Sequence, residues 1–274
     1  MKLTLILASS VVLLTGCSAP DIPIGELVRH GDIEAIKRHL AAGTDLNEKN
    51  IQESGWAPLH YASIYNRAEI AKLLIQNGAN IEIKCDAGRT PLLEAATRGQ
   101  TRVAKVLIEL GADVTASEKF GTSALGLAVM SGNTTMVELI LKSGVNINAN
   151  TDSTKKTSAL TAIHIAASQP KTEIMRYLLM NGADVNAEGN HGFSPLHIAA
   201  MNGIIECVEL LLTNGANVNS QVETGRNIGE TPLDIVVLQN SKLTSAEIAS
   251  RKEITALLRK HGGKTAEELK AAGK

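Results

Sequence analysis

The chain has 274 residues, of which 44% are hydrophobic and 20% are charged, so it can bury a large core and is not typical of a disordered segment. Only 2% of the residues are aromatic, which is few for an ordinary compact core. The 27 Lys and Arg residues balance the 28 Asp and Glu residues, which excludes a strong electrostatic field for nucleic acid. We therefore expect no nucleic-acid partner.

The first seventeen residues predict a targeting segment. Lys2 precedes an apolar stretch at 3–14, and Leu-Thr-Gly-Cys occupies 14–17. The apolar stretch has twelve residues, and a helix of that length spans about 18 Å, well short of the roughly 30 Å hydrocarbon layer of a bilayer. This pattern favours a signal peptide over a transmembrane helix.

The end of this segment resembles a bacterial lipobox, in which a signal peptidase cuts before the cysteine. The resemblance implies that residues 1–16 are removed and that Cys17 becomes a lipidated N-terminus, followed by a linker at 17–21. The lipid would hold the protein on a membrane that the chain does not cross. Ser18 follows the cysteine, which resembles the pattern sorted to the outer membrane, facing the periplasm. The alternative is an ordinary secretory signal cut at Ser18 or Ala19, with Cys17 lost.

Two markers then recur along residues 22–264. One is a Gly-x-Thr-Pro-Leu-His-like motif, and the other is a glycine that follows an apolar triplet. Successive copies of the first marker are 33, 33, 38, 33 and 37 residues apart. The first marker begins at Gly55, Gly88, Gly121, Ala159, Gly192 and Gly229, and the second lies at Gly78, Gly111, Gly144, Gly182 and Gly215.

These interleaved markers resemble the ankyrin-repeat family, whose unit is a β-turn followed by two antiparallel helices. The resemblance covers residues 22–264 and implies an all-α ankyrin solenoid, with about five full repeats between two capping repeats. The local chemistry agrees with this fold. Thr90 can cap the first helix of its repeat, with Pro91 at the first helical position. Gly78 follows the second helix, where the chain must turn through positive φ.

The two ends of the repeat array carry polar residues at positions that are apolar in the interior. An end repeat has no neighbour on one side, so polar residues are expected there. Arg38 and His39 occupy the places of an interior Leu pair, which predicts an N-terminal cap at 22–50. Arg259 occupies a place that holds Ile or Leu in the interior repeats, which predicts a C-terminal cap at 229–264.

Three polar insertions interrupt the spacing, at 150–156, 221–227 and 241–250. We expect them to form solvent-exposed loops on the turn side, and their simplest interpretation is tolerated loop growth. The tail at 265–274 predicts a short, frayed helix.

His60, His164 and His197 occupy the fourth place of the Thr-Pro-Leu-His-like motif. Adjacent repeats stack roughly 8–10 Å apart, whereas two nitrogens bound to one zinc lie at most about 4.2 Å apart. A shared metal does not fit this spacing, and no cofactor is expected. The resemblance implies instead that these histidines form hydrogen bonds with neighbouring turns.

Two cysteines lie inside the repeat region. Cys85 falls in a turn and Cys207 in a second helix, three to four repeats apart. This separation is on the order of 30 Å, against a limit of roughly 7 Å between the Cα atoms of a disulfide. We expect no disulfide and interpret Cys207 as a small buried core residue. For Cys85, an exposed and reactive thiol stays open as an alternative.

Catalytic motifs are missing from the sequence: it contains no GxSxG elbow, no HExxH and no glycine-rich phosphate loop. A scaffold with every repeat on pattern also leaves no irregular segment in which to assemble a site. We therefore predict that the chain is not an enzyme, and a hydrolase is the alternative that the sequence favours least.

The remaining candidate is a surface. In ankyrin proteins, partners generally bind the concave side formed by turn tips and first helices. Aromatic, Met and Arg residues are enriched at interfaces, and five of the six aromatic residues stand at free positions of this side. For any one of them, and for Phe193 above all, the alternative is that it only covers a seam between repeats. The predicted binding residues are Trp56, Tyr61, Tyr65, Arg89, Glu94, Arg98, Met130, Phe193 and Met201, with further free positions at Lys84, Lys119, Phe120, Thr122 and Asn202.

The sequence thus predicts a monomeric, membrane-tethered ankyrin module of the cell envelope that binds a protein. An alternative within binding is an inhibitor or immunity protein that blocks a toxin or an envelope enzyme, which a neighbouring toxin gene would favour. An alternative of another class is a structural envelope lipoprotein, which stable self-association would favour.

Overall fold

The computed structural model describes residues 22–150, 160–170, 172–238 and 244–273. These residues form fifteen α-helices and one short 3-10 helix, η1 (Asn190–Gly192). The α-helices are α1 (Ile24–His30), α2 (Ile33–Ala41), α3 (Pro58–Ile64), α4 (Ala68–Gln76), α5 (Pro91–Arg98), α6 (Thr101–Glu109), α7 (Ala124–Ser131), α8 (Thr134–Lys142), α9 (Ala162–Ala167), α10 (Thr172–Met180), α11 (Pro195–Met201), α12 (Ile205–Thr213), α13 (Pro232–Leu238), α14 (Ser245–Lys260) and α15 (Ala266–Ala271).

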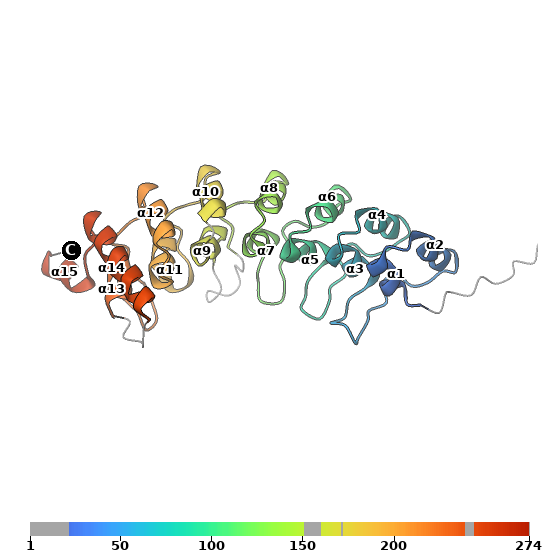
Figure 1. The fold of residues 1–274 in the computed structure, drawn as a ribbon, viewed down its shortest axis with the longest axis horizontal. Helices are drawn as coiled ribbons and strands as arrows, with labels where there is room; N and C mark the ends of the chain where they lie inside the picture. Colours follow the sequence, from blue (N-terminus) through green and yellow to red (C-terminus); the bar gives the residue numbers. More distant parts are fainter. Residues whose placement is uncertain (1–21, 151–159, 171, 239–243, 274) are drawn as a thin grey trace, which may run out of the picture.

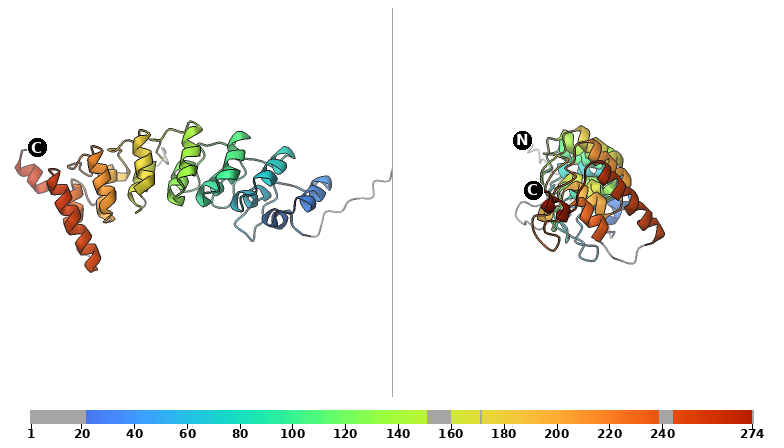
Figure 2. Two further views of the ribbon diagram at one scale, coloured as in Figure 1. Left: turned by 45° about the horizontal axis from the view of Figure 1, so that its top comes forward. Right: turned by 90° about the vertical axis from the view of Figure 1, so that its left-hand side faces the viewer.

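The first fourteen helices form pairs, from unit 1 (α1 and α2) to unit 7 (α13 and α14). The first helices of all units line up in one row and the second helices in another, and loops project below the row of first helices (Figure 1). Each first helix packs against its counterparts in the adjacent units, as α5 does against α3 and α7, and the second helices from α4 to α14 do the same. The stack is elongated, with its two ends far apart (Figure 2). This confirms the predicted all-α solenoid.

Sequence signals mark the boundaries of the helices. The Thr90 hydroxyl accepts a hydrogen bond of 3.4 Å from the N–H of Leu93, and Pro91 is the first residue of α5. Gly78 follows α4 with a φ of 95°, a left-handed conformation that glycine adopts at the least cost. The predicted start and stop signals are confirmed at these positions.

Small residues let the helices approach closely. Ala62, Ala95 and Ala128 are fully buried at equivalent positions of α3, α5 and α7, and Leu59 and Leu92 are buried beside them. Burying a Leu side chain contributes roughly 1.5–3 kcal/mol. A repeated core of Ala and Leu therefore stabilises the fold with few aromatic residues.

The N-terminal cap differs from the expectation at one residue. Arg38 is exposed, but His39 is buried. The ring of His39 is hydrogen-bonded on both sides, through Nδ1 to the Thr44 hydroxyl at 2.9 Å and through Nε2 to the Ile22 carbonyl at 3.0 Å. A buried polar group is tolerated when its hydrogen bonds are made. His39 thus holds the start of the described chain against unit 1.

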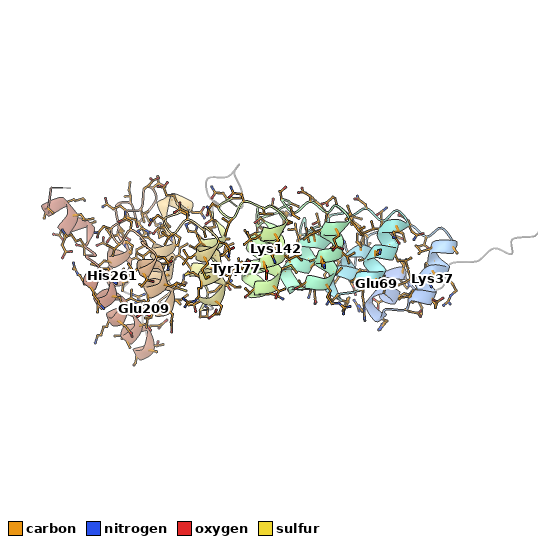
Figure 3. The ribbon with its side chains drawn as sticks, turned by 90° about the horizontal axis from the view of Figure 1, so that it is seen from above. Lys37, Glu69, Lys142, Tyr177, Glu209 and His261 are labelled. Atoms are coloured by element: carbon orange, nitrogen blue, oxygen red, sulfur yellow. The ribbon has the colours of Figure 1, made fainter. Side chains whose placement is uncertain are left out.

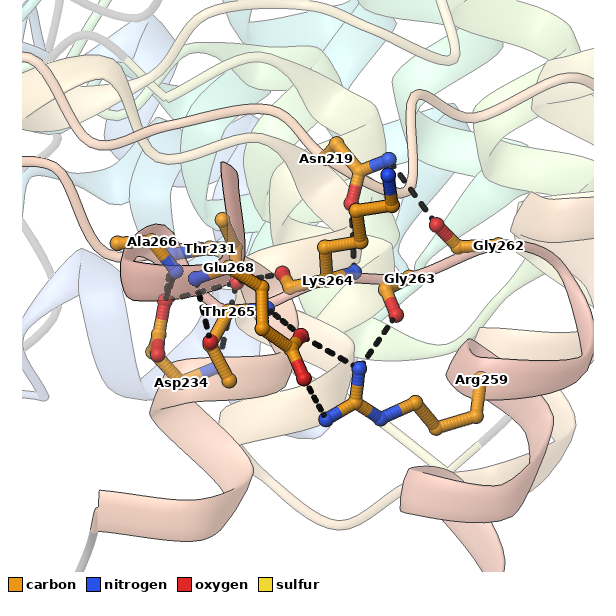
Figure 4. Close-up of polar contacts among 10 residues, drawn as sticks. All are labelled: Asn219, Thr231, Asp234, Arg259, Gly262, Gly263, Lys264, Thr265, Ala266 and Glu268. Carbon is orange, nitrogen blue, oxygen red and sulfur yellow. Dashed lines mark hydrogen bonds and ion pairs between the residues drawn. The ribbon is translucent and has the colours of Figure 1, made fainter. Parts of the chain in front are cut away.

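The C-terminal cap continues into α15. Arg259 is exposed, as expected, but it forms an ion pair with Glu268 of α15. Asp234 accepts a hydrogen bond of 2.8 Å from the N–H of Ala266, and the Thr231 hydroxyl donates one of 2.8 Å to the Lys264 carbonyl (Figure 4). The predicted tail helix is present, but these contacts fasten it to unit 7, so it is not frayed.

One predicted loop is wrong in part. Helix α14 begins at Ser245, so residues 245–250 are helical and 241–243 lie outside the described residues. A capping box fixes this start: the Thr244 hydroxyl donates to Glu247 at 2.7 Å and accepts from its N–H at 3.3 Å. The insertion at 221–227 is a largely exposed loop, as predicted. Of the insertion at 150–156, only Asn150 is described.

The targeting segment at 1–21, with Cys17 and the linker, lies outside the described residues. Within the part of the chain that is described, no helix is both long enough and apolar enough to cross a membrane.

Candidate partner-binding surface

The described loops between units project to one side of the solenoid. Several of them are hairpins that meet a neighbouring hairpin through the backbone. The N–H of Asp86 donates to the Ser54 carbonyl at 3.0 Å, and the N–H of Lys119 donates to the Ala87 carbonyl at 3.1 Å. These hairpins and the first helices border the side predicted to bind a partner, and we call this side the groove.

The second helices form the opposite, outer face. Figure 3 looks onto this face, where Lys37, Glu69, Lys142, Tyr177, Glu209 and His261 project. Charged residues pair along single helices, as Lys37 does with Glu34 at 2.8 Å and Lys105 with Glu109 at 3.8 Å. Exposed pairs of this kind contribute little to stability and are typical of a solvated surface.

Tyr61 does not lie on the groove surface as expected, because only 2% of it is exposed. A β-carbon at Gly25 would lie 2.8 Å from its ring, so the two units pack tightly here. The Tyr61 hydroxyl donates to Glu53 at 2.6 Å and accepts from Asn50 at 3.0 Å. Burial, followed by the hydrogen bond to Glu53, raises the pKa of Tyr61 to about 12. Tyr61 therefore joins unit 1 to unit 2.

Arg29 of α1 organises the neighbouring aromatic residues. Its guanidinium lies 5.4 Å from the ring centre of Tyr65 and binds Glu53 at 2.9 Å. Hydrogen bonding, above all from Tyr61, lowers the pKa of Glu53. Trp56 is half-buried, with its ring edge-on to Tyr61 at 5.7 Å. Of the three predicted aromatic anchors of this end, Tyr65 is the most exposed, at 37%.

A chain of ion pairs runs along α5. Glu94, predicted to be a surface residue, is buried. Its carboxylate lies 3.7 Å from Nη1 of Arg89 and 3.8 Å from Nε of Arg98. A fourth member, Glu118 of the next hairpin, was not among the predicted residues and is buried 4.0 Å from Nε of Arg89. The sequence carries no signal for Glu118, because the contact depends on how two hairpins stack.

The groove of the later units carries apolar groups. Met130 and Met201 are exposed near the ends of α7 and α11, and 75% of Phe120 is exposed at a hairpin tip. Phe193 is half-buried and lies against His197, with ring centres 5.5 Å apart. Phe193 therefore covers a seam between repeats, which was the alternative to a role in partner binding.

The three motif histidines form the hydrogen bonds that the resemblance implied. His60 accepts the N–H of Ala57 at Nδ1 and donates from Nε2 to the Arg89 carbonyl of the next unit at 3.0 Å. His164 and His197 repeat this arrangement. Burial lowers the pKa of all three, for His197 to about 4. No group of three or more His, Cys, Asp or Glu among the described residues is placed to hold a metal ion.

Both described cysteines are free and buried, which confirms that they do not pair. Burial raises the pKa of the Cys207 thiol to about 11, as fits a core residue. The Cys85 thiol lies 3.9 Å from Glu94, and its burial argues against an exposed reactive thiol.

A stack of helix pairs with hairpins projecting to one side defines a helical-repeat scaffold. A family profile described as ankyrin repeats (3 copies) matches residues 25–118 and 125–222. The chain belongs to the ankyrin-repeat family. Domains of this family generally mediate protein–protein interaction and are generally not catalytic.

Two solved structures resemble the whole domain. The ankyrin-repeat domain of human ASB11 is 26% identical, with a TM-score of 0.68 over 85% of this chain and 97% of that chain. The ankyrin-repeat domain of Bcl-3, a member of the IkappaB family, is 25% identical, with a TM-score of 0.69 over 87% and 98%. A mouse protein, ankyrin repeat domain-containing protein 40, is 34% identical over 58 residues, which cover 21% of this chain and only 16% of the mouse protein.

Proposed function

We propose that this protein is an envelope-tethered ankyrin module that binds a protein partner in its groove as a monomer and performs no catalysis. The observation that carries the proposal is the exposure of Tyr65, Arg98, Met130 and Met201 near the ends of four first helices. These residue types are enriched among the anchors of protein interfaces.

The rigidity of the groove supports the same function. The Arg29 guanidinium lies over the ring of Tyr65, and backbone hydrogen bonds join the hairpins that carry Ser54, Asp86 and Lys119. A surface that is already ordered loses little conformational entropy when a partner binds. Central anchors of this kind typically contribute about 2 kcal/mol each, roughly a thirtyfold change in affinity.

Lipidation of Cys17 supplies the tether in this proposal, on the periplasmic side of the outer membrane. More than one acyl chain makes such anchoring stable. Cys17→Ser should therefore abolish fatty-acid labelling and release the protein from membranes, or leave it uncleaved. A variant that labels and fractionates like the parent would refute the tether and leave the binding proposal standing.

Site-specific photo-crosslinking in cells tests the groove. A photoreactive phenylalanine analogue is placed at Phe120, Met130 or Met201, and for comparison at Tyr177 or Met180 of α10 on the outer face. We expect a shared crosslinked protein from the groove positions and none from the outer positions. Adducts confined to the outer positions would overturn the proposal.

A further inference from the structure

We propose that the groove at units 3 and 4 recognises an acidic segment of the partner, whose carboxylates bind Arg89 and Arg98. This inference rests on the proposed function, because it assumes that the partner occupies the groove. The inference extends that proposal by specifying the charge of the partner segment that binds the groove.

The first observation is that the positively charged side chains in this part of the groove are exposed, whereas the negatively charged ones are buried. The side chains of Arg89 and Arg98 are 28% and 43% exposed, whereas those of Glu94 and Glu118 are each only 4% exposed. The exposed Lys119 adjoins the Arg89 hairpin, since its N–H binds the Ala87 carbonyl at 3.1 Å. The acids thus lie beneath the surface, and the partner meets positive charge.

The second observation is unused hydrogen-bonding capacity. The ion pairs within this group have nitrogen–oxygen distances of 3.7, 3.8 and 4.0 Å, which is too long for hydrogen bonds. Neither guanidinium donates a hydrogen bond to any group in the described ranges, and Nε of Arg89 is buried without an acceptor. A guanidinium carries five N–H donors in a planar fork that matches a carboxylate. The buried Nε of Arg89 faces Oε2 of Glu118, which is also buried without a hydrogen-bond partner, so a partner can reach only the exposed part of the Arg89 guanidinium. The more exposed Arg98 guanidinium offers its donors beside it.

The surroundings favour an acidic segment over a basic one. Lys or Arg side chains would meet like charge from Arg89, Arg98 and Lys119, which is unfavourable when water is excluded. An exposed acid, Asp86, lies on the same hairpin, but its carboxylate packs against Gly55 of the preceding hairpin. Tyr65 of unit 2 and Met130 of unit 4 flank the arginines, so apolar residues of the partner would lie beside its acids.

The test uses a phage-displayed library of random linear peptides, selected on the purified full-length protein in detergent. We expect the selected peptides to be enriched in Asp and Glu. A synthetic version of a selected peptide, with its Asp and Glu residues changed to Asn and Gln, should lose its affinity for the protein. The affinity of the unchanged acidic peptide should fall as salt is added. Fluorescence anisotropy with the labelled peptides measures each effect.

Protein variants locate the contact. Arg89→Gln and Arg98→Gln should each weaken the acidic peptides by roughly tenfold or more, as expected for hydrogen bonds to charged groups. Arg102→Gln makes the same chemical change on the exposed surface of α6 and should leave the affinity unchanged. Because Arg98→Gln leaves Glu94 with one partner fewer, the double variant Glu94→Gln, Arg98→Gln is also measured and should bind as weakly. Glu94→Gln alone should keep binding.

The outcomes separate the two proposals. If the selected peptides are neutral or basic and lose affinity in Tyr65→Ala or Met130→Ala, the acidic partner is refuted and groove binding stands. If acidic peptides bind Arg89→Gln and Arg98→Gln as well as they bind the parent, the assignment of these arginines is refuted. If no selected peptide responds to any groove variant, both proposals fail.

Discussion

The guanidinium of Arg259 binds both carboxylate oxygens of Glu268, with nitrogen–oxygen distances of 2.6 and 2.9 Å (Figure 4). Arg259 closes the last repeat and Glu268 belongs to α15, so this bidentate pair fastens the final helix to the end of the stack. The solenoid therefore ends with a helix that is held in place.

The pair makes the docking of α15 dependent on pH. Hydrogen bonds from Arg259, and then from the Thr265 N–H, lower the pKa of Glu268 to about 2, from about 4.3 in an unfolded chain. The stabilisation is complete above the unfolded value and is lost as the pH falls towards 2. The protection factors of the amides of residues 266–271, which compare exchange with that of an unstructured chain at the same pH, should fall over this range. In Arg259→Leu they should already be low at neutral pH, and equal protection in parent and variant would contradict the pairing.

Stability should depend on which apolar residue of α10 is changed. Leu178 is fully buried, whereas Leu179, which occupies the interior place that Arg259 holds in the last repeat, is only half-buried. Leu178→Ala should cost about 2–5 kcal/mol through the cavity it leaves, and Leu179→Ala clearly less. Leu178→Arg should unfold the interior repeats, because it buries an unpaired charge, while Leu179→Arg can direct its charge to solvent. Urea denaturation measures all four, and equal losses at both positions would refute this distinction.

Tyr61 should be a stability residue. Tyr61→Phe removes the hydrogen bonds to Glu53 and Asn50 and should cost about 1 kcal/mol, and Tyr61→Ala should cost about 3–5 kcal/mol, as for other large buried side chains. Tyr65→Phe, on the exposed neighbour, serves as the control and should change little. If Tyr61→Ala melts at the temperature of the parent, the packing of unit 1 on Tyr61 is not as described.

Acid should destabilise the fold through the buried histidines. The pKa of His197 is about 4 in the folded chain and about 6.5 when unfolded. The unfolded state therefore binds more protons between these values, and stability falls as the pH drops from about 6.5 to 4, by about 3 kcal/mol in total. His60 and His164 act in the same direction. His197→Gln should be less stable at pH 7 but lose less on acidification, whereas an unchanged pH dependence would contradict the burial of a neutral ring.

Features that depend on local chemistry were predictable from the sequence. The caps at Thr90 and Pro91 and the turn at Gly78 each follow from a residue and its immediate neighbours. The histidine contacts reach the next unit and were expected only from the resemblance to ankyrin repeats. The start of α14 carried the same kind of signal, a Thr at 244 and a Glu at 247, and its expectation as a loop was an error of interpretation.

The burial of the candidate site was not predictable, because it depends on contacts between units. Tyr61 and Glu94 occupy positions that are free in a single repeat. In the stack, α1 with Gly25 covers Tyr61, and the arginines lie over Glu94. Which free position stays exposed depends on the residues of the adjacent hairpin and helix.

The most direct test of groove binding compares capture of the crosslinked partner by variants of the two faces. Tyr65→Ala and Arg98→Ala should each weaken capture by roughly thirtyfold, with helical circular dichroism close to that of the parent. The melting temperature should stay near that of the parent in Tyr65→Ala and fall in Arg98→Ala, because the buried Glu94 loses one of its partners. Lys72→Ala and Lys105→Ala, on exposed positions of α4 and α6, should leave capture unchanged. Loss of capture in the two lysine variants, with normal capture by Tyr65→Ala and Arg98→Ala, would show that the partner binds the outer face.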